Sequence, residues 1–427
     1  MLRDYQIDLL NKLKMSILQG HKKICVVAAC GSGKSYIIKE IIDGAKAKHS
    51  NILVLCHRIE LKNQLEDLLG IEVMLYQTAT RHLNTIPTPD IIIVDESHLS
   101  LNKSYYRIFD YFKDAIILGF TATPVKNNLG GLGLVYDDLI IGVDTKWLIA
   151  NHYLAPYEYY SYPLLERREL VKDSTGEYEL PIKHKLYGDV VSTYTRLANG
   201  KKAIVFASSI AHSKELCDLF NANGIPAFHL DGETPDKERR QAIADFRSGK
   251  IKVLCNFLIV AEGLSVDDCD VCILCKPTSS LARYLQSAMR CMRYKEGKTA
   301  IIIDHCQNYL EHGMVDDDRG WSLAMKRRTR VDLDDKELTI RQCAKCFRVY
   351  EGNRQECPYC HHINAKPKKQ IEMEQQAELE RIKKIERKKQ GMAQTYEQLV
   401  AIGKARGYAN PRGWAYHIMR SRNNENI

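Results

Sequence analysis

The sequence predicts an α/β protein with two parallel-sheet domains in tandem, followed by a small cysteine-rich module and a helical, basic C-terminal region. Short apolar runs rich in β-branched residues alternate with helical patterns in both halves of the chain, and this alternation predicts the sheets. Two Cys-x-x-Cys pairs in the C-terminal third predict the module. We expect domains at residues 1–152, 153–330, 338–364 and 365–427.

Length and composition restrict the class of protein. The 427 residues suffice for about three domains with their own cores, and Lys and Arg outnumber Asp and Glu by 62 to 53, which suits a polyanionic partner. Scattered single cysteines without a secretion signal indicate a reducing compartment, and no apolar run approaches a bilayer's thickness. We therefore expect a cytoplasmic protein with no membrane partner.

A phosphate-binding loop is the strongest local signal. An apolar run at residues 24–28 leads directly into a glycine-rich segment, after which a helical pattern begins. Glycines let backbone N–H groups surround phosphate oxygens, and the helix N-terminus adds positive potential. Lys34 would reach the β- and γ-phosphates, and the Ser35 hydroxyl would coordinate Mg²⁺. Ala28 replaces the first glycine of the general pattern. The predicted ATP-binding residues here are Cys30, Gly31, Ser32, Gly33, Lys34 and Ser35.

The N-terminal segment has apolar residues at helical spacing and begins with Arg3 and Gln6. A glutamine amide offers both a donor and an acceptor, so Gln6 together with Arg3 could read the edge of an adenine.

Three further strand-like runs follow, at residues 51–56, 91–94 and 115–120, and each ends in polar residues. Chemistry in open parallel sheets lies at the carboxyl ends of the strands. Asp95 is the expected second Mg²⁺ ligand, and Glu96 beside it could orient or deprotonate an attacking water. An acidic pair is usually solvated surface, but this pair follows four apolar β-branched residues.

These segments together resemble successive motifs of a superfamily-two, DEAD/DEAH-box-type helicase. The resemblance implies two RecA-like domains, nucleic-acid-stimulated ATP hydrolysis with Mg²⁺, and catalytic roles for Lys34, Asp95 and Glu96. It implies that His98, Thr121 and Thr123 couple hydrolysis to movement. It also implies that nucleic acid is contacted by His57, Arg58, Gln77 and Thr78. Ser97 departs from the family at the third position of the acidic motif.

The second half of the chain begins with a Tyr- and Pro-rich stretch at 153–163, which we interpret as the linker and entry to a second domain. Strand-like runs recur at 203–207, 227–230, 253–255, 271–275 and 299–303, without a second phosphate-binding loop. A helical pattern at 284–293 places Arg290 and Arg293 three residues apart on one face. Such arginines are more often solvated or paired with acids. Under the resemblance they become arginine fingers for the nucleotide, with Gln286 beside them, although Met289 replaces the family's glycine.

Residues 260–267 resemble the motif that links the nucleotide and nucleic-acid sites, which adds Gly263 and Asp267 to the predicted ATP contacts. Residues 231–234 with Arg239 and Arg240 resemble the accessory motif before it. Residues 304–321 resemble a narrower branch, the RadD-like and phage-encoded helicases. This branch implies the cytosol of a bacterium or of a phage-infected host.

Two Cys-x-x-Cys pairs with ten residues between them predict a four-thiolate, structural zinc site. The ligands are Cys343, Cys346, Cys357 and Cys360; a pair of redox dithiols is the competing interpretation. Another set of cysteines is spaced by three, but strand alternation would point Cys272 and Cys275 to opposite faces, which argues against a metal there.

The C-terminal region is basic, with residues 361–427 contributing 14 Lys and Arg against 7 Asp and Glu. A solvated helix and tail is one interpretation. The other is a nucleic-acid clamp containing Arg412 and Trp414, since aromatics stack on bases while arginines neutralise phosphates. A single-strand-binding, replication or repair protein is another candidate partner for this region.

We conclude from sequence that the chain is an ATP-dependent helicase or translocase, with DNA favoured over RNA, acting on branched or forked DNA. Its expected cofactors are ATP, Mg²⁺ and structural Zn²⁺. The alternatives are an RNA helicase, a translocase on duplex DNA that does not separate strands, a non-hydrolysing nucleic-acid binding module, and the motor of a nuclease with a partner subunit.

Overall fold

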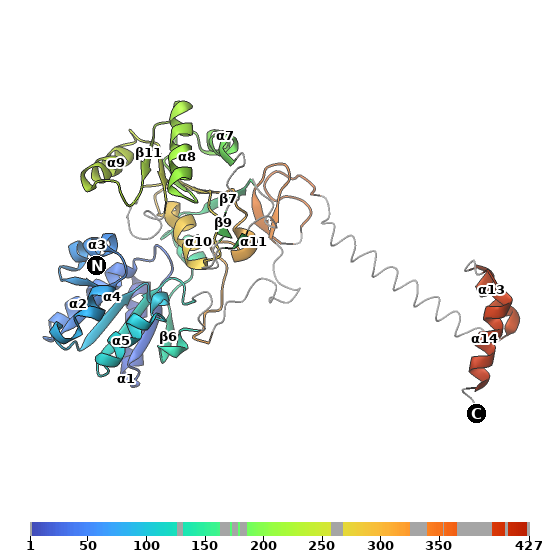
Figure 1. The fold of residues 1–427 in the computed structure, drawn as a ribbon, viewed down its shortest axis with the longest axis horizontal. Helices are drawn as coiled ribbons and strands as arrows, with labels where there is room; N and C mark the ends of the chain where they lie inside the picture. Colours follow the sequence, from blue (N-terminus) through green and yellow to red (C-terminus); the bar gives the residue numbers. More distant parts are fainter. Residues whose placement is uncertain are drawn as a thin grey trace. The chain divides into compact units, whose positions relative to one another are not determined.

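The computed structural model describes residues 2–125, 131–162, 171–172, 178–179, 186–257, 268–324, 340–352, 354–364, 395–405 and 409–424. Within these ranges it contains two six-stranded sheets in which every described pairing is parallel, as the alternation of strands and helices predicted (Figure 1). We call the first sheet with its helices the first lobe and the second sheet with its helices the second lobe.

The first lobe has the strand order β3-β2-β4-β5-β1-β6. Its strands are β1 (Lys23–Val27), β2 (Ile52–Cys56), β3 (Val73–Leu75), β4 (Ile91–Asp95), β5 (Ile116–Thr121) and β6 (Asp138–Ile141). Its helices are α1 (Asp4–Leu18), α2 (Lys34–Lys46), α3 (Ile59–Leu69), α4 (Tyr76–Arg81), α5 (Lys103–Tyr111) and α6 (Thr145–Ala150), with 3₁₀ turns at Leu83–Thr85, Ser97–Leu99 and Leu132–Leu134. The central strands read as continuous apolar runs because each packs into a core on both faces of the sheet.

The second lobe has the strand order β11-β12-β10-β13-β14-β7. Its strands are β7 (Tyr157–Ser161), β10 (Ala203–Phe206), β11 (Ala227–Leu230), β12 (Val253–Asn256), β13 (Val271–Leu274) and β14 (Ala300–Asp304). Its helices are α7 (Leu186–Ala198), α8 (Ile210–Ala222), α9 (Asp236–Ser248), α10 (Leu281–Ala288) and α11 (Tyr309–His312), with the 3₁₀ helix η5 at Met289–Met292 and a small hairpin of β8 (Val171–Lys172) and β9 (Tyr178–Glu179). The stretch that we interpreted as a linker therefore contains an edge strand, β7.

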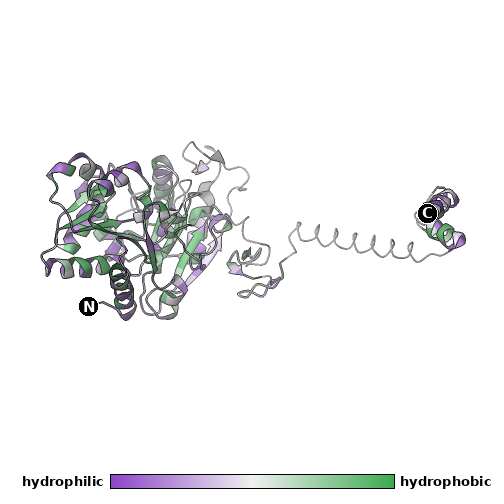
Figure 2. Ribbon diagram, turned by 90° about the horizontal axis from the view of Figure 1, so that it is seen from below, coloured by the Kyte–Doolittle hydropathy of each residue, from purple (hydrophilic) through white to green (hydrophobic). Residues whose placement is uncertain are grey.

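Hydropathy follows the layers of both lobes. Hydrophobic residues colour most of the strands, whereas the helices alternate between hydrophobic and hydrophilic stretches (Figure 2). Alternation along β13 places Cys272 in the core on one face of the second sheet and Cys275 in the core on the other. Cys272 and Cys275 are thus on opposite faces, as predicted. In the described ranges, no helix is both long and apolar enough to cross a bilayer.

A small hairpin of β15 (Ile340–Gln342) and β16 (Val349–Glu351) lies against the open edge of the second sheet at β7. The Ser161 N–H donates to the Phe347 carbonyl over 3.0 Å, and the Tyr162 and Phe347 rings stack at 4.5 Å. The Arg348 guanidinium pairs with Glu158, and its Nε donates to the Tyr160 hydroxyl over 2.9 Å. These contacts cover an edge that would otherwise expose unpaired backbone groups.

Near the C-terminus, α13 (Tyr396–Ala405) and α14 (Pro411–Asn424) form a helical hairpin with its own small core. Leu399 and Ala415 are fully buried there, and Trp414 packs against them. A Cβ added at Gly403 would lie 3.1 Å from the Trp414 ring, so the glycine permits the close approach of the two helices. The expected charged helix at residues 365–390 lies outside the described residues.

Candidate active site and metal centre

Neighbouring strands bring the three predicted active-site segments of the first lobe to one edge. β5 lies between β1 and β4, and the register pairs Val27 with Thr121 and Asp95 with Phe120. Parallel strands end at the same edge of a sheet. The phosphate-binding loop, the acidic pair and the Thr121–Thr123 segment therefore meet there, although 94 residues separate Val27 from Thr121 along the chain.

The phosphate-binding loop is held open by two glycines in the left-handed region, Gly31 at φ +80° and Gly33 at φ +81°. A Cβ at Gly33 would lie 2.5 Å from Gln6 Nε2, so another residue would displace that amide. Gln6 Nε2 donates to the Ser32 carbonyl over 2.9 Å, and Gln6 Oε1 accepts the Arg3 N–H. The predicted adenine-reading glutamine is thus also a direct support of the loop.

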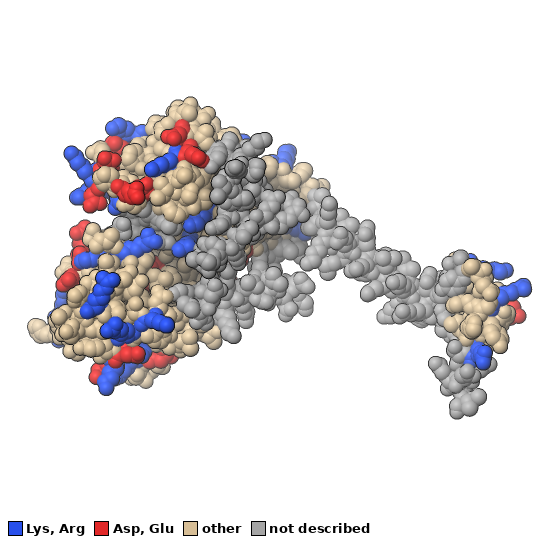
Figure 3. Space-filling model, in the orientation of Figure 1, with Lys and Arg blue, Asp and Glu red and all other residues tan. Residues whose placement is uncertain are grey.

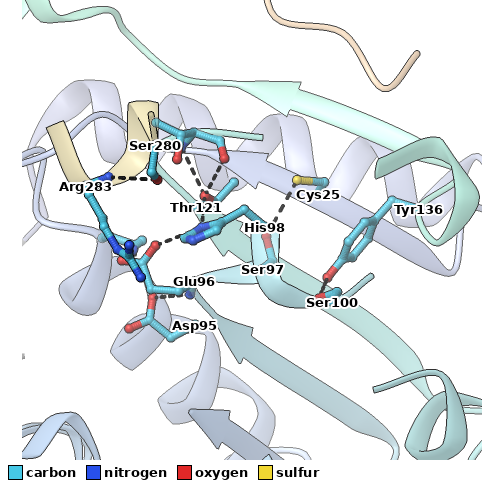
Figure 4. Close-up of polar contacts among 12 residues, drawn as sticks. Cys25, Asp95, Glu96, Ser97, His98, Ser100, Thr121, Tyr136, Ser280 and Arg283 are labelled. Atoms are coloured by element: carbon cyan, nitrogen blue, oxygen red, sulfur yellow. Dashed lines mark hydrogen bonds and ion pairs between the residues drawn. The ribbon is translucent and has the colours of Figure 1, made fainter. Parts of the chain in front are cut away.

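Lys34 opens α2 and carries the central charge of the site. Its Nζ lies 2.9 Å from Asp95 Oδ1 and 3.0 Å from Glu96 Oε1 (the two carboxylates appear in Figure 4). Burial lowers the pKa of Lys34, but the two carboxylates outweigh it and leave that pKa above its usual value. Burial raises the pKa of Glu96, but Lys34 and His98 together outweigh burial. The pKa of Glu96 therefore lies below its usual value, and Glu96 is ionised. The sequence predicted these three residues in one site, and the structure brings them into contact.

The acidic segment continues into the predicted coupling residues. Glu96 has a left-handed backbone at φ 54°, which turns the chain sharply after β4. His98 Nδ1 lies 3.3 Å from Glu96 Oε2 and 3.2 Å from the Thr121 hydroxyl (Figure 4). That hydroxyl accepts the Thr123 N–H over 3.0 Å. A continuous polar chain therefore joins the catalytic carboxylate to the Thr121–Thr123 segment.

Two buried polar atoms at this edge have no hydrogen-bond partner among the described residues, Ser32 Oγ and His57 Nδ1. Buried polar groups are normally satisfied, so unsatisfied ones facing a phosphate-binding loop fit a polar ligand. Ser35 and Asp95, as hydroxyl and carboxylate oxygens, are also the kind of donors that Mg²⁺ takes. The residues present thus fit a nucleotide phosphate and its Mg²⁺.

Arginines of the second lobe approach the same loop. Arg290 lies in η5 and Arg293 directly follows it. A Cβ at Gly31 would lie 4.0 Å from Arg293 Nη1. Burial and then Glu96 raise the pKa of the Cys30 thiol to about 11, against the charges of Lys34, Arg290 and Arg293, which lower it. Both guanidinium groups are therefore near enough to act electrostatically on the loop.

The two lobes share a cavity of about 340 Å³ beside the loop. Ala29 and Cys30 line it from the first lobe, and Leu285 and Met289 line it from the second. The helical pattern predicted for 284–293 is only partly helical: α10 ends at Ala288, and 3₁₀ turns carry Arg290. Gln286 is half-buried on α10.

Predicted nucleic-acid contacts of the first lobe lie at strand ends and on a helix surface. His57 and Arg58 follow β2 and are half-buried, and burial lowers the pKa of His57. Gln77 and Thr78 are exposed on α4. Their contacts with nucleic acid remain predictions. Gly263 and Asp267 lie outside the described residues.

Aromatic residues that the sequence did not single out complete the surroundings of the loop. The Tyr5 hydroxyl donates to the Ser32 carbonyl over 2.8 Å, beside Gln6. The Tyr5 ring lies 5.6 Å from Trp147 and 4.9 Å from Tyr153, and the Arg3 guanidinium sits 4.5 Å from the Tyr153 ring centre. Tyr5 adjoins Gln6 in sequence, but only the fold brings Trp147 and Tyr153 next to it.

The four predicted zinc ligands gather in one place. The Sγ atoms of Cys343, Cys346, Cys357 and Cys360 all lie within 4.8 Å of one another. The Cys343 N–H donates to the Arg348 carbonyl, and the Cys357 N–H donates to the His362 carbonyl, which folds each Cys-x-x-Cys turn. Four thiolates at tetrahedral reach are the donor set of structural zinc. The residues present thus fit that ion.

Comparisons with known proteins agree with this geometry. The family model described as type III restriction enzyme, res subunit, matches residues 1–70 and 69–126, and that of the helicase conserved C-terminal domain matches 186–295. A 51.5 kDa protein of a Lactococcus phage (isolate 7-9) is 37% identical over 367 residues, which cover 83% of this chain and 81% of the phage protein. The ATP-dependent helicase IRC3 of Saccharomyces cerevisiae is 29% identical over 71% of this chain, which spans 50% of that relative.

Solved structures share the fold at lower identity. The type ISP restriction-modification enzyme LlaBIII bound to DNA aligns over 71% of this chain and 27% of its own, with a TM-score of 0.54 and 17% identity. The Escherichia coli DEAH/RHA helicase HrpB aligns over 70% and 42%, with a TM-score of 0.51 and 14% identity. Because a relative is matched over most of its length and the second lobe carries the conserved helicase domain, the chain belongs to the superfamily-two helicases, which are ATP-hydrolysing nucleic-acid motors.

Proposed function

We propose that the chain is a DNA helicase or translocase that hydrolyses ATP between its two lobes and remodels forked or branched DNA. The observation that carries the proposal is that Arg290 and Arg293 of the second lobe approach the phosphate-binding loop of the first. Lys34 follows that loop and contacts Asp95 and Glu96. The match to a restriction-enzyme subunit and the fold shared with a DNA-bound restriction enzyme favour DNA.

In this proposal, Lys34 binds the β- and γ-phosphates of ATP, while Ser35 and Asp95 hold Mg²⁺, which neutralises phosphate charge when bound. Lys34 is the largest influence lowering the pKa of Glu96 in the structure. When Lys34 turns to phosphate, that pKa rises, and Glu96 becomes a better acceptor for a proton of the attacking water. Arg290 and Arg293 stabilise charge on the transferring phosphoryl group, and the loss of that charge after hydrolysis lets the lobes separate.

The remaining roles follow from position. We propose that His98, Thr121 and Thr123 transmit the state of Glu96 along their polar chain, and that His57, Arg58, Gln77 and Thr78 contact the nucleic-acid backbone. Gln286, Gly263 and Asp267 are proposed nucleotide contacts. Zn²⁺ bound by the four clustered cysteines would be structural, because four protein ligands leave no open coordination position. We propose domains at residues 1–152, 153–330, 338–364 and 365–427, and a cytoplasmic location.

Steady-state ATPase measured with matched single-stranded DNA, duplex DNA, forked DNA and RNA tests the substrate. We expect single-stranded and forked DNA to stimulate turnover more than RNA does, with Glu96→Gln as the inactive background. Stimulation by duplex alone, without strand separation, would instead identify a duplex translocase. Stimulation by RNA alone would favour an RNA helicase. No turnover with any substrate would leave a binding module.

A further inference from the structure

The exposed face of α14 carries an alternating basic and aromatic row. Arg412, Tyr416 and Arg420 follow one another at intervals of four residues, so they lie on one side of the helix over about 12 Å. All three are exposed, and Tyr416 is 57% exposed. We call these three residues the α14 row.

The opposite face of α14 packs in the core of the helical hairpin. Ala415 is fully buried, and Trp414, Ile418 and Met419 pack around it against α13. Trp414 also meets Gly403 closely, so its ring supports the hairpin. The sequence predicted Trp414 as the residue that stacks on a base, but its ring packs inside the hairpin. Tyr416 is the exposed tyrosine of α14 and can take that role instead.

Charge on the hairpin is strongly one-sided. Residues 395–424 contain five Lys and Arg and a single acidic residue, Glu397. Figure 3 shows blue side chains on the visible face of α13 and α14, with little red. Among the described residues, neither Arg412 nor Arg420 forms an ion pair within 4.0 Å. The row therefore presents one exposed aromatic ring between two positive charges, the combination of groups that single-stranded nucleic acid binds.

We propose that the α14 row binds one strand of single-stranded nucleic acid, with the Tyr416 ring stacked on a base and Arg412 and Arg420 on the flanking phosphates. Stacking on one aromatic accepts any base, and arginines on a backbone read no sequence. The row would therefore give the motor a second, sequence-independent hold on its track. This inference rests on the proposed nucleic-acid track of the motor but not on the preference for DNA.

Two hydrogen bonds within the hairpin support the α14 row. The Tyr396 hydroxyl donates to the Arg412 carbonyl over 3.1 Å, and the Asn410 side chain accepts the Gly413 N–H over 2.9 Å. These bonds fix the first turn of α14, which positions Arg412 relative to Tyr416. The row is thus presented on an ordered helix with its own core.

The test measures binding of the full chain, in the absence of ATP, to labelled dT20 and rU20. Fluorescence anisotropy gives the affinity at each point of a salt series. Arg412→Gln with Arg420→Gln should flatten the slope of log affinity against log salt by roughly 1.4, because each lost phosphate contact on a single strand contributes about 0.7. Tyr416→Ala should weaken binding roughly fivefold to hundredfold with an unchanged slope, and Tyr416→Phe should restore it.

Lys12→Gln is the matched control, since it removes one exposed charge from α1, far from the row in sequence. Its affinity and slope should equal those of the wild type. If the affinities and slopes of the row variants equal those of Lys12→Gln on both oligonucleotides, the inference is overturned. If the row variants weaken binding to rU20 but not to dT20, the row is upheld as a nucleic-acid site while the proposed preference for DNA fails. ATP turnover with saturating DNA reports separately on the active site.

Discussion

At the scale of single residues, the account depends on a small network of charges. The Lys34 ammonium lies about equally close to Asp95 and Glu96, at 2.9 and 3.0 Å. One ammonium therefore balances a buried carboxylate, Asp95, and a partly buried one, Glu96. Removing either partner leaves a buried charge without its counterion, which is unfavourable, and removes a group that the chemistry needs.

Lys34→Ala and Glu96→Gln should each reduce nucleic-acid-stimulated ATP turnover by at least two orders of magnitude. Lys34 supplies phosphate binding, and a positioned general base contributes roughly 10²–10⁴ in rate. A coupled ATPase assay on the purified variants measures the effect. Asp8→Asn, which changes an exposed carboxylate on α1, should leave turnover unchanged; normal turnover in either active-site variant would disprove the assignment.

Acid stability provides an independent readout of Glu96. Its pKa in the folded chain lies below the value of about 4.3 expected when unfolded. The stability that this carboxylate contributes is present above the unfolded pKa and is lost as pH falls toward the folded pKa. Between pH 7 and pH 3.5, Tm should therefore fall less in Glu96→Gln than in the wild type. Equal falls would mean that Lys34 and His98 do not hold Glu96 ionised.

At the scale of elements, central strands were more predictable than short strands and strands at sheet edges. The runs at 91–94 and 271–275 correspond closely to β4 and β13, because strands buried on both faces are continuously apolar. Within the two six-stranded sheets, three strands escaped prediction: β3 has three residues, and β6 and β7 lie at sheet edges where residues need not be apolar. A stretch rich in tyrosine and proline such as 153–163 has the composition of a linker, and only pairing with β14 makes it a strand.

Some residues of the candidate site could likewise be predicted from the sequence, and others could not. The acidic residues of the first lobe could be predicted because they stand where an apolar strand ends, as Asp95 does at the end of β4. The support of the phosphate-binding loop by Tyr5, and the ring cluster of Tyr5, Trp147 and Tyr153, could not. The contacts of Tyr5 with Trp147 and Tyr153 join residues more than 140 positions apart, and no local pattern marks them.

The cysteine cluster predicts one bound zinc per chain. Cys357→Ser should lose the metal, because three thiolates cannot close the tetrahedron, and the turn at Cys357 should loosen. Elemental analysis of the purified protein measures zinc, and thermal unfolding measures stability. Cys306→Ser, which changes a half-buried cysteine outside the cluster, should retain both. Full zinc in Cys357→Ser would assign the four thiols to another chemistry.

At the scale of the whole motor, ATP turnover needs both lobes at once. The first lobe holds the phosphate-binding loop and the carboxylates, and the second lobe supplies Arg290 and Arg293 beside Cys30 and Gly31. Motif order predicted both halves of this arrangement. It could not predict that α10 ends at Ala288, so that a 3₁₀ turn rather than a regular helix presents the arginines.

The most direct test of this shared site is single-turnover ATP hydrolysis by Arg290→Ala and Arg293→Ala on saturating single-stranded DNA, with ATP affinity measured in parallel. An arginine finger contributes on the order of 10³–10⁵ in rate, so we expect hydrolysis to fall by about that factor while ATP still binds. Lys295→Gln, an exposed charge in the same segment, should hydrolyse ATP at the wild-type rate. Hydrolysis within threefold of wild type in both arginine variants, roughly 0.6 kcal/mol in barrier height, would contradict catalysis between the lobes.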